Sequence, residues 1–253
     1  MNEKIRIYVT AHKPFRLPKG IDTSLFVPIF CGKAVYDPEE FPAPSGRFIL
    51  PELGDDTGDN RSIENRHYSE LTGHYWIWKN DKDSDIIGVN HYRRYFYDNE
   101  NYDLIDRETI LKNLKEYDFM VSGPSSDSKP WYDEEWSIYN GYKASHNICD
   151  MDNALLACKR LYPELYDKFE YEIKMGTCMC LCNLMICKKE KFNEYCSFLF
   201  SIIDEVRKTI DYDDPKYQQY QIRVFGFLGE RMFRPWLIAK GYKFKDQQIF
   251  TFE

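Results

Sequence analysis

Short apolar segments with strand spacing alternate with segments of helical spacing along this chain, and this alternation constrains the fold more than any other feature. Ile5, Ile7 and Val9 alternate with polar residues, which is typical of a strand, and another short apolar run covers residues 86–89. Between them, apolar and aromatic residues recur at helical spacing from Ser62, a suitable N-cap, to residue 80. Repeated strand and helix units predict an α/β fold with a mixed sheet flanked by helices.

The rest of the chain continues this pattern. Asp106 is a suitable N-cap for a further helix, and residues 118–124 have the pattern of a strand that runs into a turn. The spacing then predicts a helix over 151–161, a strand over 177–187, helices over 189–208 and 217–239, and terminal strands over 241–252. Pro235 should kink the last helix. No stretch has the composition of a linker, so residues 1–253 are expected to form a single domain.

Charge and cysteine usage exclude several classes of protein. The formal net charge is −7, from 34 basic and 41 acidic side chains, which does not favour nucleic acid as a partner. The eight cysteines form no Cys-x-x-Cys pair, and a strand would bury Cys178, Cys180 and Cys182 on one face, so reduced thiols fit better than disulfides or zinc. No segment is apolar enough for a signal peptide or a membrane span, so we expect a cytoplasmic protein.

Polar and cationic residues follow two of the predicted strands directly. Thr10, His12 and Lys13 follow the first strand, and His91-Tyr92-Arg93-Arg94 follows the strand at 86–89. Ligands of open α/β sheets bind at the carboxyl ends of strands. Guanidinium groups match phosphate oxygens in a bidentate manner, so residues 91–94 would suit a diphosphate. On local sequence alone, a surface basic patch paired with acidic neighbours explains residues 91–94 equally well.

An acidic, glycine-containing loop at residues 54–60 precedes the first predicted helix. Its side chains, among them Asp56 and Asn60, could hold a ribose, a sugar or a cation. Asp and Asn are also common before helices simply because they cap them, so both interpretations stay open. A metal site needs more converging ligands than this one loop offers.

Glu230 and Arg231 lie within an otherwise apolar helical segment, Gly226 to Met232. Charged side chains are rarely buried unless they are paired. Glu230 is therefore expected to have either an ion-pair partner or a chemical task, such as that of a general base.

Several strings in this sequence resemble a bacterial family long catalogued as a domain of unknown function. The family occurs in capsular polysaccharide and O-antigen synthesis clusters and has been grouped with glycosyltransferases, in particular galactofuranosyltransferases. The similar strings cover nearly the whole chain in order: 54–60, 70–72, 75–80, Gly88, 91–96, 183–186, 188–189, 192–199 and 223–232.

The resemblance implies a GT-A-like, Rossmann-related fold and transfer of a sugar from a nucleotide diphosphate donor to a glycan acceptor. The implied donor is a UDP-sugar, with UDP-galactofuranose as the specific candidate. In GT-A enzymes an Asp-x-Asp motif usually holds a divalent cation on the diphosphate, and here residues 91–94 take the corresponding place. We therefore assign no metal ligand and expect cationic side chains to replace the metal, while a need for Mg²⁺ or Mn²⁺ stays open. Lipid-linked acceptors are common in such clusters, which leaves contact with the inner face of the membrane open.

The resemblance also suggests roles for individual residues. An inverting transfer needs a carboxylate that deprotonates the acceptor hydroxyl, and Glu230 is the first candidate and Asp59 the second. The residues expected to bind the nucleotide-sugar donor are Thr10, His12, Lys13, Asp56, Asn60, Asn65, His91, Tyr92, Arg93 and Arg94. His146 and Asn183 are expected to contact the acceptor, although a hydrogen-bonded surface histidine explains His146 as well.

Two functions from other classes remain. A catalytically inactive nucleotide-sugar or glycan-binding module would keep the same residues without turnover. A metal-dependent phosphodiesterase would need a carboxylate cluster, for which the sequence offers only Asp55, Asp56 and Asp59.

Overall fold

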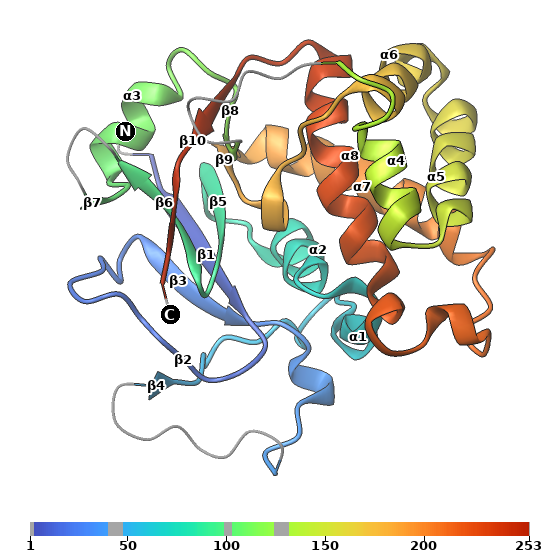
Figure 1. Cartoon of the computed structure of the whole chain (residues 1–253). Helices are drawn as coiled ribbons and strands as arrows, with labels where there is room; N and C mark the ends of the chain where they lie inside the picture. The colour runs from blue at the N-terminus through green and yellow to red at the C-terminus, as the bar shows by residue number, and fades with distance from the viewer. Residues whose placement is uncertain (1–2, 40–47, 99–102, 124–131, 253) are drawn as a thin grey trace.

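The centre of the molecule is a nine-stranded mixed sheet. The computed structural model describes residues 3–39, 48–98, 103–123 and 132–252. The main path of the sheet has the order β10 (Phe244–Gln247), β8 (Phe119–Ser122), β9 (Met185–Lys188), β5 (Ile86–His91), β1 (Ile5–Ala11) and β3 (Phe26–Phe30). Neighbours along this path are parallel except at β9, which is antiparallel to β5 and β8. The sheet therefore takes strands from both ends of the sequence (Figure 1).

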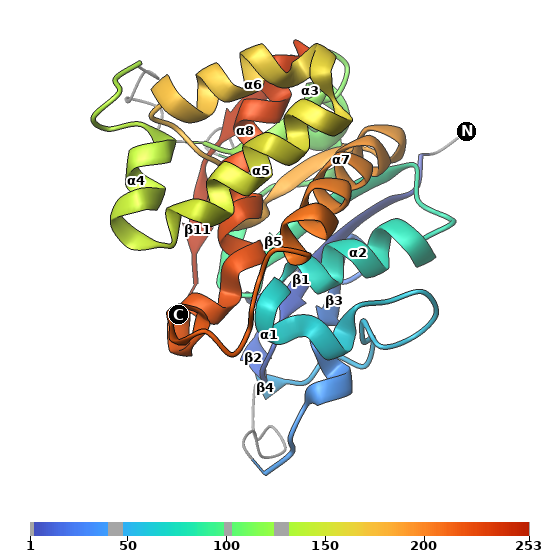
Figure 2. The same cartoon turned by 90° about the vertical axis from the view of Figure 1, so that its right-hand side faces the viewer.

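One face of the sheet is covered by a layer of helices, which Figure 2 shows in front of the strands. These helices are α2 (Leu71–Asn80), α4 (Ile138–Ser145), α5 (Ile148–Leu161), α6 (Pro163–Met175), α7 (Lys189–Arg207) and α8 (Val224–Lys240). Their apolar side chains form one core cluster with strand residues such as Tyr8 and Phe119. Ile7 and Val9 belong to the second cluster, on the other face. The alternation seen in the sequence thus separates the two cores, because successive side chains of a strand point to opposite faces.

The second face carries β6 (Arg94–Asp98), β7 (Asp103–Leu104), β11 (Ile249–Thr251) and α3 (Arg107–Asn113). β6 pairs with β5, β7 and β11 in antiparallel fashion. His91 and Arg94 face each other across the β5–β6 pair, so Tyr92 and Arg93 form the turn between these strands. The basic residues that follow β5 are therefore held by a tight hairpin.

The remaining elements are short and lie in the connections. β2 (Phe15–Arg16) pairs with β4 (Phe48–Ile49). The helical turns are η1 (Lys33–Val35), η2 (Ser62–Glu64), α1 (Asn65–Tyr68), η3 (Leu181–Asn183), η4 (Pro215–Tyr217) and η5 (Gln219–Arg223).

The predicted mixed α/β sheet flanked by helices is confirmed. The helix predicted after Asp106 is also confirmed as α3, and the Asp106 carboxylate accepts a hydrogen bond from the N–H of Thr109 as an N-cap does. The strand predicted over 118–124 is β8, with residue 124 outside the described part of the chain. Within the described residues, no helix is long and apolar enough to cross a membrane.

The single helix predicted from Ser62 to residue 80 is wrong, because the backbone breaks between α1 and α2. Ser69 has a φ of 52°, which ends α1 after one turn. Ser62 is not the N-cap, since its hydroxyl donates to the buried Asp55 carboxylate instead.

The strand predicted over 177–187 is also wrong for most of its length. Only β9 is a strand, because Cys182 and the residue after it have φ values of 56° and 53° and form the turn η3. Cys178, Cys180 and Cys182 therefore do not share one face, and of the three only Cys180 is buried.

The predicted helix over 217–239 begins later, as α8 at Val224, and continues past Pro235 to Lys240. The two turns η4 and η5 precede it. The prediction also missed α4 and α6, which belong to the same helical layer.

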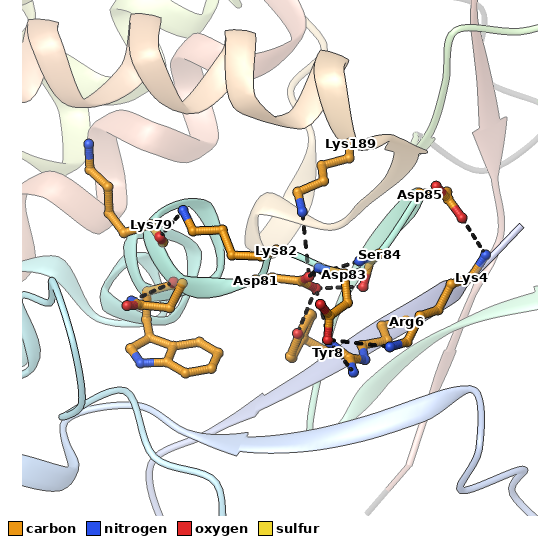
Figure 3. A network of polar contacts seen from close by, with 12 residues as sticks. Lys4, Arg6, Tyr8, Lys79, Asp81, Lys82, Asp83, Ser84, Asp85 and Lys189 are labelled. Atoms are coloured by element: carbon orange, nitrogen blue, oxygen red, sulfur yellow. Dashed lines mark hydrogen bonds and ion pairs between the residues drawn. The ribbon is translucent and has the colours of Figure 1, made fainter.

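A buried carboxylate, Asp81, joins the ends of β1 and β5 where these strands begin to the start of α7 (Figure 3). It accepts hydrogen bonds from the hydroxyls of Tyr8 at 2.8 Å and Ser84 at 2.6 Å. Arg6 and Lys189 each lie 3.6 Å from one of its oxygens. Burial alone would raise the pKa of Asp81, but the hydrogen bonds from Ser84 and Tyr8 lower it to about 2. This carboxylate therefore anchors the sheet at the edge where the strands begin.

Candidate active site

A cavity of about 530 Å³ opens at the carboxyl ends of β1 and β5. Thr10 lines it from β1, His12 from the position directly after β1, and His91 from the last position of β5. The rest of the lining comes from the β5–β6 hairpin, the end of β3, the α1–α2 junction, η3, η5 and the first half of α8. Ligands of parallel sheets bind at this edge, so the cavity is the candidate site.

Four arginines line the cavity: Arg66 of α1, Arg93 and Arg94 of the β5–β6 hairpin, and Arg223 of η5. Among the described residues, none of the four guanidinium groups has a carboxylate partner within ion-pair distance. Unpaired arginines that converge on one cavity favour a multiply charged anion such as a diphosphate. Arg93 and Arg94 therefore do not pair with acidic neighbours in the described part of the chain, as the alternative interpretation of residues 91–94 required.

The two histidines in the cavity wall do not add to this positive charge at neutral pH. Burial, followed by the cations Lys13, Arg223 and Arg93, lowers the pKa of His12. The pKa of His91 is lowered first by burial and then by Arg94 and Arg93. Both imidazoles are therefore neutral at pH 7 and available as hydrogen-bonding groups.

Two of the predicted donor contacts hold the backbone that forms the cavity. The Thr10 hydroxyl donates to the carbonyl of Asn90 at 3.0 Å, which joins the ends of β1 and β5. The amide of Asn65 donates to the carbonyl of Ser69 at 2.7 Å and to the hydroxyl of Thr72 at 2.9 Å. These bonds stabilise the strained Ser69 turn, where a serine with positive φ costs of order 1–3 kcal/mol.

Directly after this turn, Glu70 stands at the N-cap position of α2 with its side chain in the cavity. Its Oε1 accepts a hydrogen bond of 2.8 Å from the amide of Asn183. The ring of His74, one turn into α2, contacts the carbonyl oxygens of Glu70 and Asn183 at 3.2 and 3.1 Å. Burial, and next the charge of Glu230, raise the pKa of Glu70 to about 7.

Glu230 of α8 is the second carboxylate that lines the cavity. Its Oε1 accepts the backbone N–H of Cys182 at 2.6 Å, and its Oε2 accepts from Arg231 at 2.9 Å. Arg231 is therefore the ion-pair partner of Glu230, and a chemical task of Glu230 stays a prediction.

The structure does not bring the acidic loop to the cavity. Asp59 accepts a hydrogen bond from the hydroxyl of Tyr75, and its carbonyl accepts one from the amide of Asn80. Tyr75 and Asn80 follow Glu70 by five and ten residues, about 7 and 15 Å along α2 at 1.5 Å per residue. Asp59 therefore lies at the opposite end of α2 from the cavity.

The other residues of this loop have structural roles or face solvent. Asn60 bonds within its own turn, to the carbonyl of Gly58 and the N–H of Ser62, and Asp56 is exposed. Asp55 is fully buried and accepts hydrogen bonds from the N–H groups of residues 32 and 33 and from Ser62. This carboxylate fixes the chain after β3.

Four more predicted site residues lie beside the cavity without lining it. Lys13 and Tyr92 line a neighbouring apolar hollow that Arg93 shares with the cavity. His146 stacks on Phe227, which does line the cavity, and bonds to Gln221. Asn183 is fully buried and reaches the site only through its bond to Glu70.

The residues present do not fit a divalent cation. Within the described part of the chain, no group of three or more His, Cys, Asp or Glu side chains is placed to hold a metal ion. The cavity combines four arginines with only two carboxylates, and cations of this kind repel a metal ion.

The sequence analysis missed three charged lining residues, Arg66, Glu70 and Arg223. Each lies in or directly before the first turn of a helix, where a charged residue is ordinary and carries no specific signal. The string 70–72 in the family resemblance was the only pointer to Glu70.

Comparison with known proteins agrees with this architecture. The model of the family described as "Domain of unknown function (DUF4422)" matches residues 6–241. The solved apo structure of WbbM, a bifunctional glycosyltransferase, is similar with a TM-score of 0.75 and 26% identity over 99% of this chain. The chain spans 45% of the length of that protein's chain. No curated protein matches the chain. The chain thus has a GT-A-like fold similar to that of a glycosyltransferase, and it belongs to the DUF4422 family.

Proposed function

We propose that this protein transfers a sugar from a nucleoside diphosphate donor to a hydroxyl group of a glycan acceptor. The observation that carries the proposal is the cavity at the carboxyl ends of β1 and β5, which is lined by two glutamates and by four arginines that have no carboxylate partner among the described residues. A diphosphate is bound and stabilised by cations such as these arginines, and an acceptor hydroxyl needs a carboxylate that takes its proton. The structural similarity to WbbM, described as a bifunctional glycosyltransferase, supports the same class of reaction.

The arginines stabilise the leaving group. When the bond between the anomeric carbon and the diphosphate breaks, negative charge develops on the phosphate oxygens. Arg93 and Arg94 are held by the β5–β6 hairpin, and Arg66 and Arg223 come from two other elements. Preorganised cations of this kind lower the barrier without reorganisation during the reaction. Arginine therefore takes the role that a divalent cation has in other enzymes of this fold.

The finer assignments rest on the family resemblance. The proposed donor is a UDP-sugar, with UDP-galactofuranose as the first compound to test, and the proposed reaction inverts the anomeric centre. The proposed acceptor is a glycan of capsule, exopolysaccharide or O-antigen synthesis. If that glycan is carried by a lipid, the protein works in the cytoplasm at the inner face of the membrane.

The test measures transfer and donor hydrolysis with a panel of nucleotide sugars, with and without EDTA. The double variant Arg93→Ala, Arg94→Ala should lose binding of the nucleoside diphosphate by about 1–3 kcal/mol per removed contact, and turnover should fall with it. Arg160→Ala is the matched control, since Arg160 is exposed on α5, pairs with Glu205 and lies outside the cavity.

Three outcomes contradict the proposal in different ways. If the double variant keeps full activity, the reaction does not need Arg93 and Arg94. If EDTA abolishes the activity completely, the reaction needs a metal ion. Binding of nucleotide sugars without turnover identifies an inactive binding module. Metal-dependent cleavage of phosphodiesters identifies the phosphodiesterase alternative.

A further inference from the structure

We propose that Glu70, and not Glu230, accepts the proton of the acceptor hydroxyl during transfer, while Glu230 lies beside it and is held by the N–H of Cys182 and by Arg231. This inference rests on the function proposed above. It concerns a residue that the sequence did not single out.

The two glutamates are joined through one short turn. Cys182 and Asn183 are consecutive residues of η3, and both have positive φ. The N–H of Cys182 donates to Glu230, and the side chain of Asn183 donates to Glu70. Strained turns of this kind persist where the surroundings hold them and are common at functional sites. Here η3 positions both carboxylates at the same cavity.

The partners of the two carboxylates differ. Glu230 accepts from a backbone N–H with one oxygen and from the Arg231 guanidinium with the other, so both oxygens are occupied by strong donors. Among the described residues, Glu70 accepts from the neutral amide of Asn183 and from its own backbone N–H, and neither donor carries a charge. Glu230 is therefore held by a charged donor that Glu70 lacks.

The electrostatic environment of Glu70 suits a general base at neutral pH. Burial contributes most and the negative charge of Glu230 contributes next, and together they raise the pKa of Glu70 to about 7. A base is most effective when its pKa lies near the working pH. Two carboxylates with different environments commonly divide acid–base and charge-stabilising roles in this way.

The other charged and titratable groups around Glu70 do not titrate near neutral pH. Arg223 of η5 is a permanent cation that partly offsets the effect of Glu230. Burial raises the pKa of three other neighbours, the thiols of Cys31 and Cys182 and the hydroxyl of Tyr195. The ring of His74 contacts the carbonyl of Glu70, and burial lowers its pKa. His12 and His91 line the same cavity with lowered pKa values. A change in activity near pH 7 should therefore report Glu70.

The proposed step is a direct displacement. A lone pair of the acceptor oxygen forms the new bond to the anomeric carbon, and the electron pair of the bond to the donor's phosphate oxygen leaves with the nucleoside diphosphate. The acceptor's hydroxyl proton moves to the carboxylate of Glu70, which becomes neutral. The leaving diphosphate gains one negative charge, which the cavity arginines stabilise. Glu70 then returns its proton to water.

The experiment compares Glu70→Gln, Glu70→Asp and Glu230→Gln in the full chain. Glu70→Gln should lower kcat by about 10²–10⁴-fold, the usual contribution of a general base, while binding of uridine diphosphate is not weakened. In the wild type, kcat/KM should fall below about pH 7. Glu70→Asp should keep this acidic limb at a reduced rate.

Glu230→Gln separates the two glutamates. If Glu70 is the base, the acidic limb moves to lower pH in this variant, because the charge that raises the pKa of Glu70 is gone. If Glu230 is the base, the limb disappears in Glu230→Gln and persists in Glu70→Gln, which overturns the inference. A ¹³C NMR titration measures the pKa of Glu70 without turnover, in the wild type and in Glu230→Gln. The Glu70 carboxyl resonance is identified as the one that is absent from the spectrum of Glu70→Gln.

Failure of the inference and failure of the proposed function are distinguishable. If no nucleoside diphosphate binds and no donor is turned over by the wild type, the proposed function is overturned and the role of Glu70 falls with it. If the wild type is active and Glu70→Gln keeps its kcat and its acidic limb, only the role of Glu70 is overturned.

Discussion

Replacing Glu70 by glutamine should stabilise the fold at neutral and alkaline pH, although it should abolish transfer. Glutamine has nearly the same shape, and its carbonyl oxygen can still accept the hydrogen bond from Asn183. What it lacks is the charge that the half-buried site disfavours. The variant therefore isolates the free-energy cost of holding an ionised carboxylate at this position.

The size and sign of the effect follow from the pKa of Glu70. Its pKa is 4.5 in the ordinary case and about 7 in the folded protein. Each pKa unit corresponds to about 1.4 kcal/mol, so the full difference corresponds to about 3.5 kcal/mol, and solvent screening at a half-buried side chain reduces it to about 2 kcal/mol. Between these two pH values the folded protein binds more protons than the unfolded chain, so wild-type stability falls as pH rises.

Urea unfolding at a series of pH values measures this difference. Glu70→Gln and wild type should be equally stable at about pH 4, where both states of the wild type are protonated at this position. The variant should be more stable by about 2 kcal/mol at pH 8, or roughly 4–8 °C in Tm for a chain of this size. Glu116→Gln, a change at an exposed glutamate, should stay within about 0.5 kcal/mol at every pH.

A stabilisation that does not depend on pH would refute the reasoning, because it would arise from packing and not from charge. Equal stability at pH 8 would refute it as well. If the variant is both more stable and inactive, the ionised Glu70 carboxylate lowers the stability of the wild type and is kept because the reaction needs it.

Two further predictions concern carboxylates outside the cavity. Asp81→Asn should lower the free energy of unfolding by about 2 kcal/mol at pH 7, because hydrogen bonds lower the pKa of Asp81 from 3.8 to about 2. This stability is present above pH 3.8 and is lost as pH falls towards 2, so urea unfolding at pH 7 and pH 2 should show the difference shrinking; a constant difference would contradict it. Asp55→Ala leaves two backbone N–H groups and the Ser62 hydroxyl without their acceptor and should cost at least about 3 kcal/mol in thermal unfolding. Asp56→Ala, at the exposed neighbour, should cost less than about 0.5 kcal/mol, and equal losses in the two variants would contradict the role of Asp55.

The candidate site divides into residues that the sequence pointed to and residues that it did not. Arg93 and Arg94 were recognisable because an unusual run of cations follows a short apolar strand directly. Glu70 was not, because an acidic residue at the start of a helix is ordinary. Asp59 of the acidic loop was predicted to belong to the site, but it contacts α2 at the end away from the cavity. Nothing in the local sequence tells which end of α2 this loop contacts.

The sequence by itself determined the fold class and pointed to the edge of the sheet where the candidate site lies. Period-two and helical spacing are local properties, and each strand carries its polar ending with it along the chain. Only the tertiary structure decided which charged groups meet. Glu70 and Glu230 are 160 positions apart and share a cavity because the turn at η3 bonds to both. The raised pKa of Glu70 arises from burial and from the charge of Glu230, and neither exists until the chain has folded.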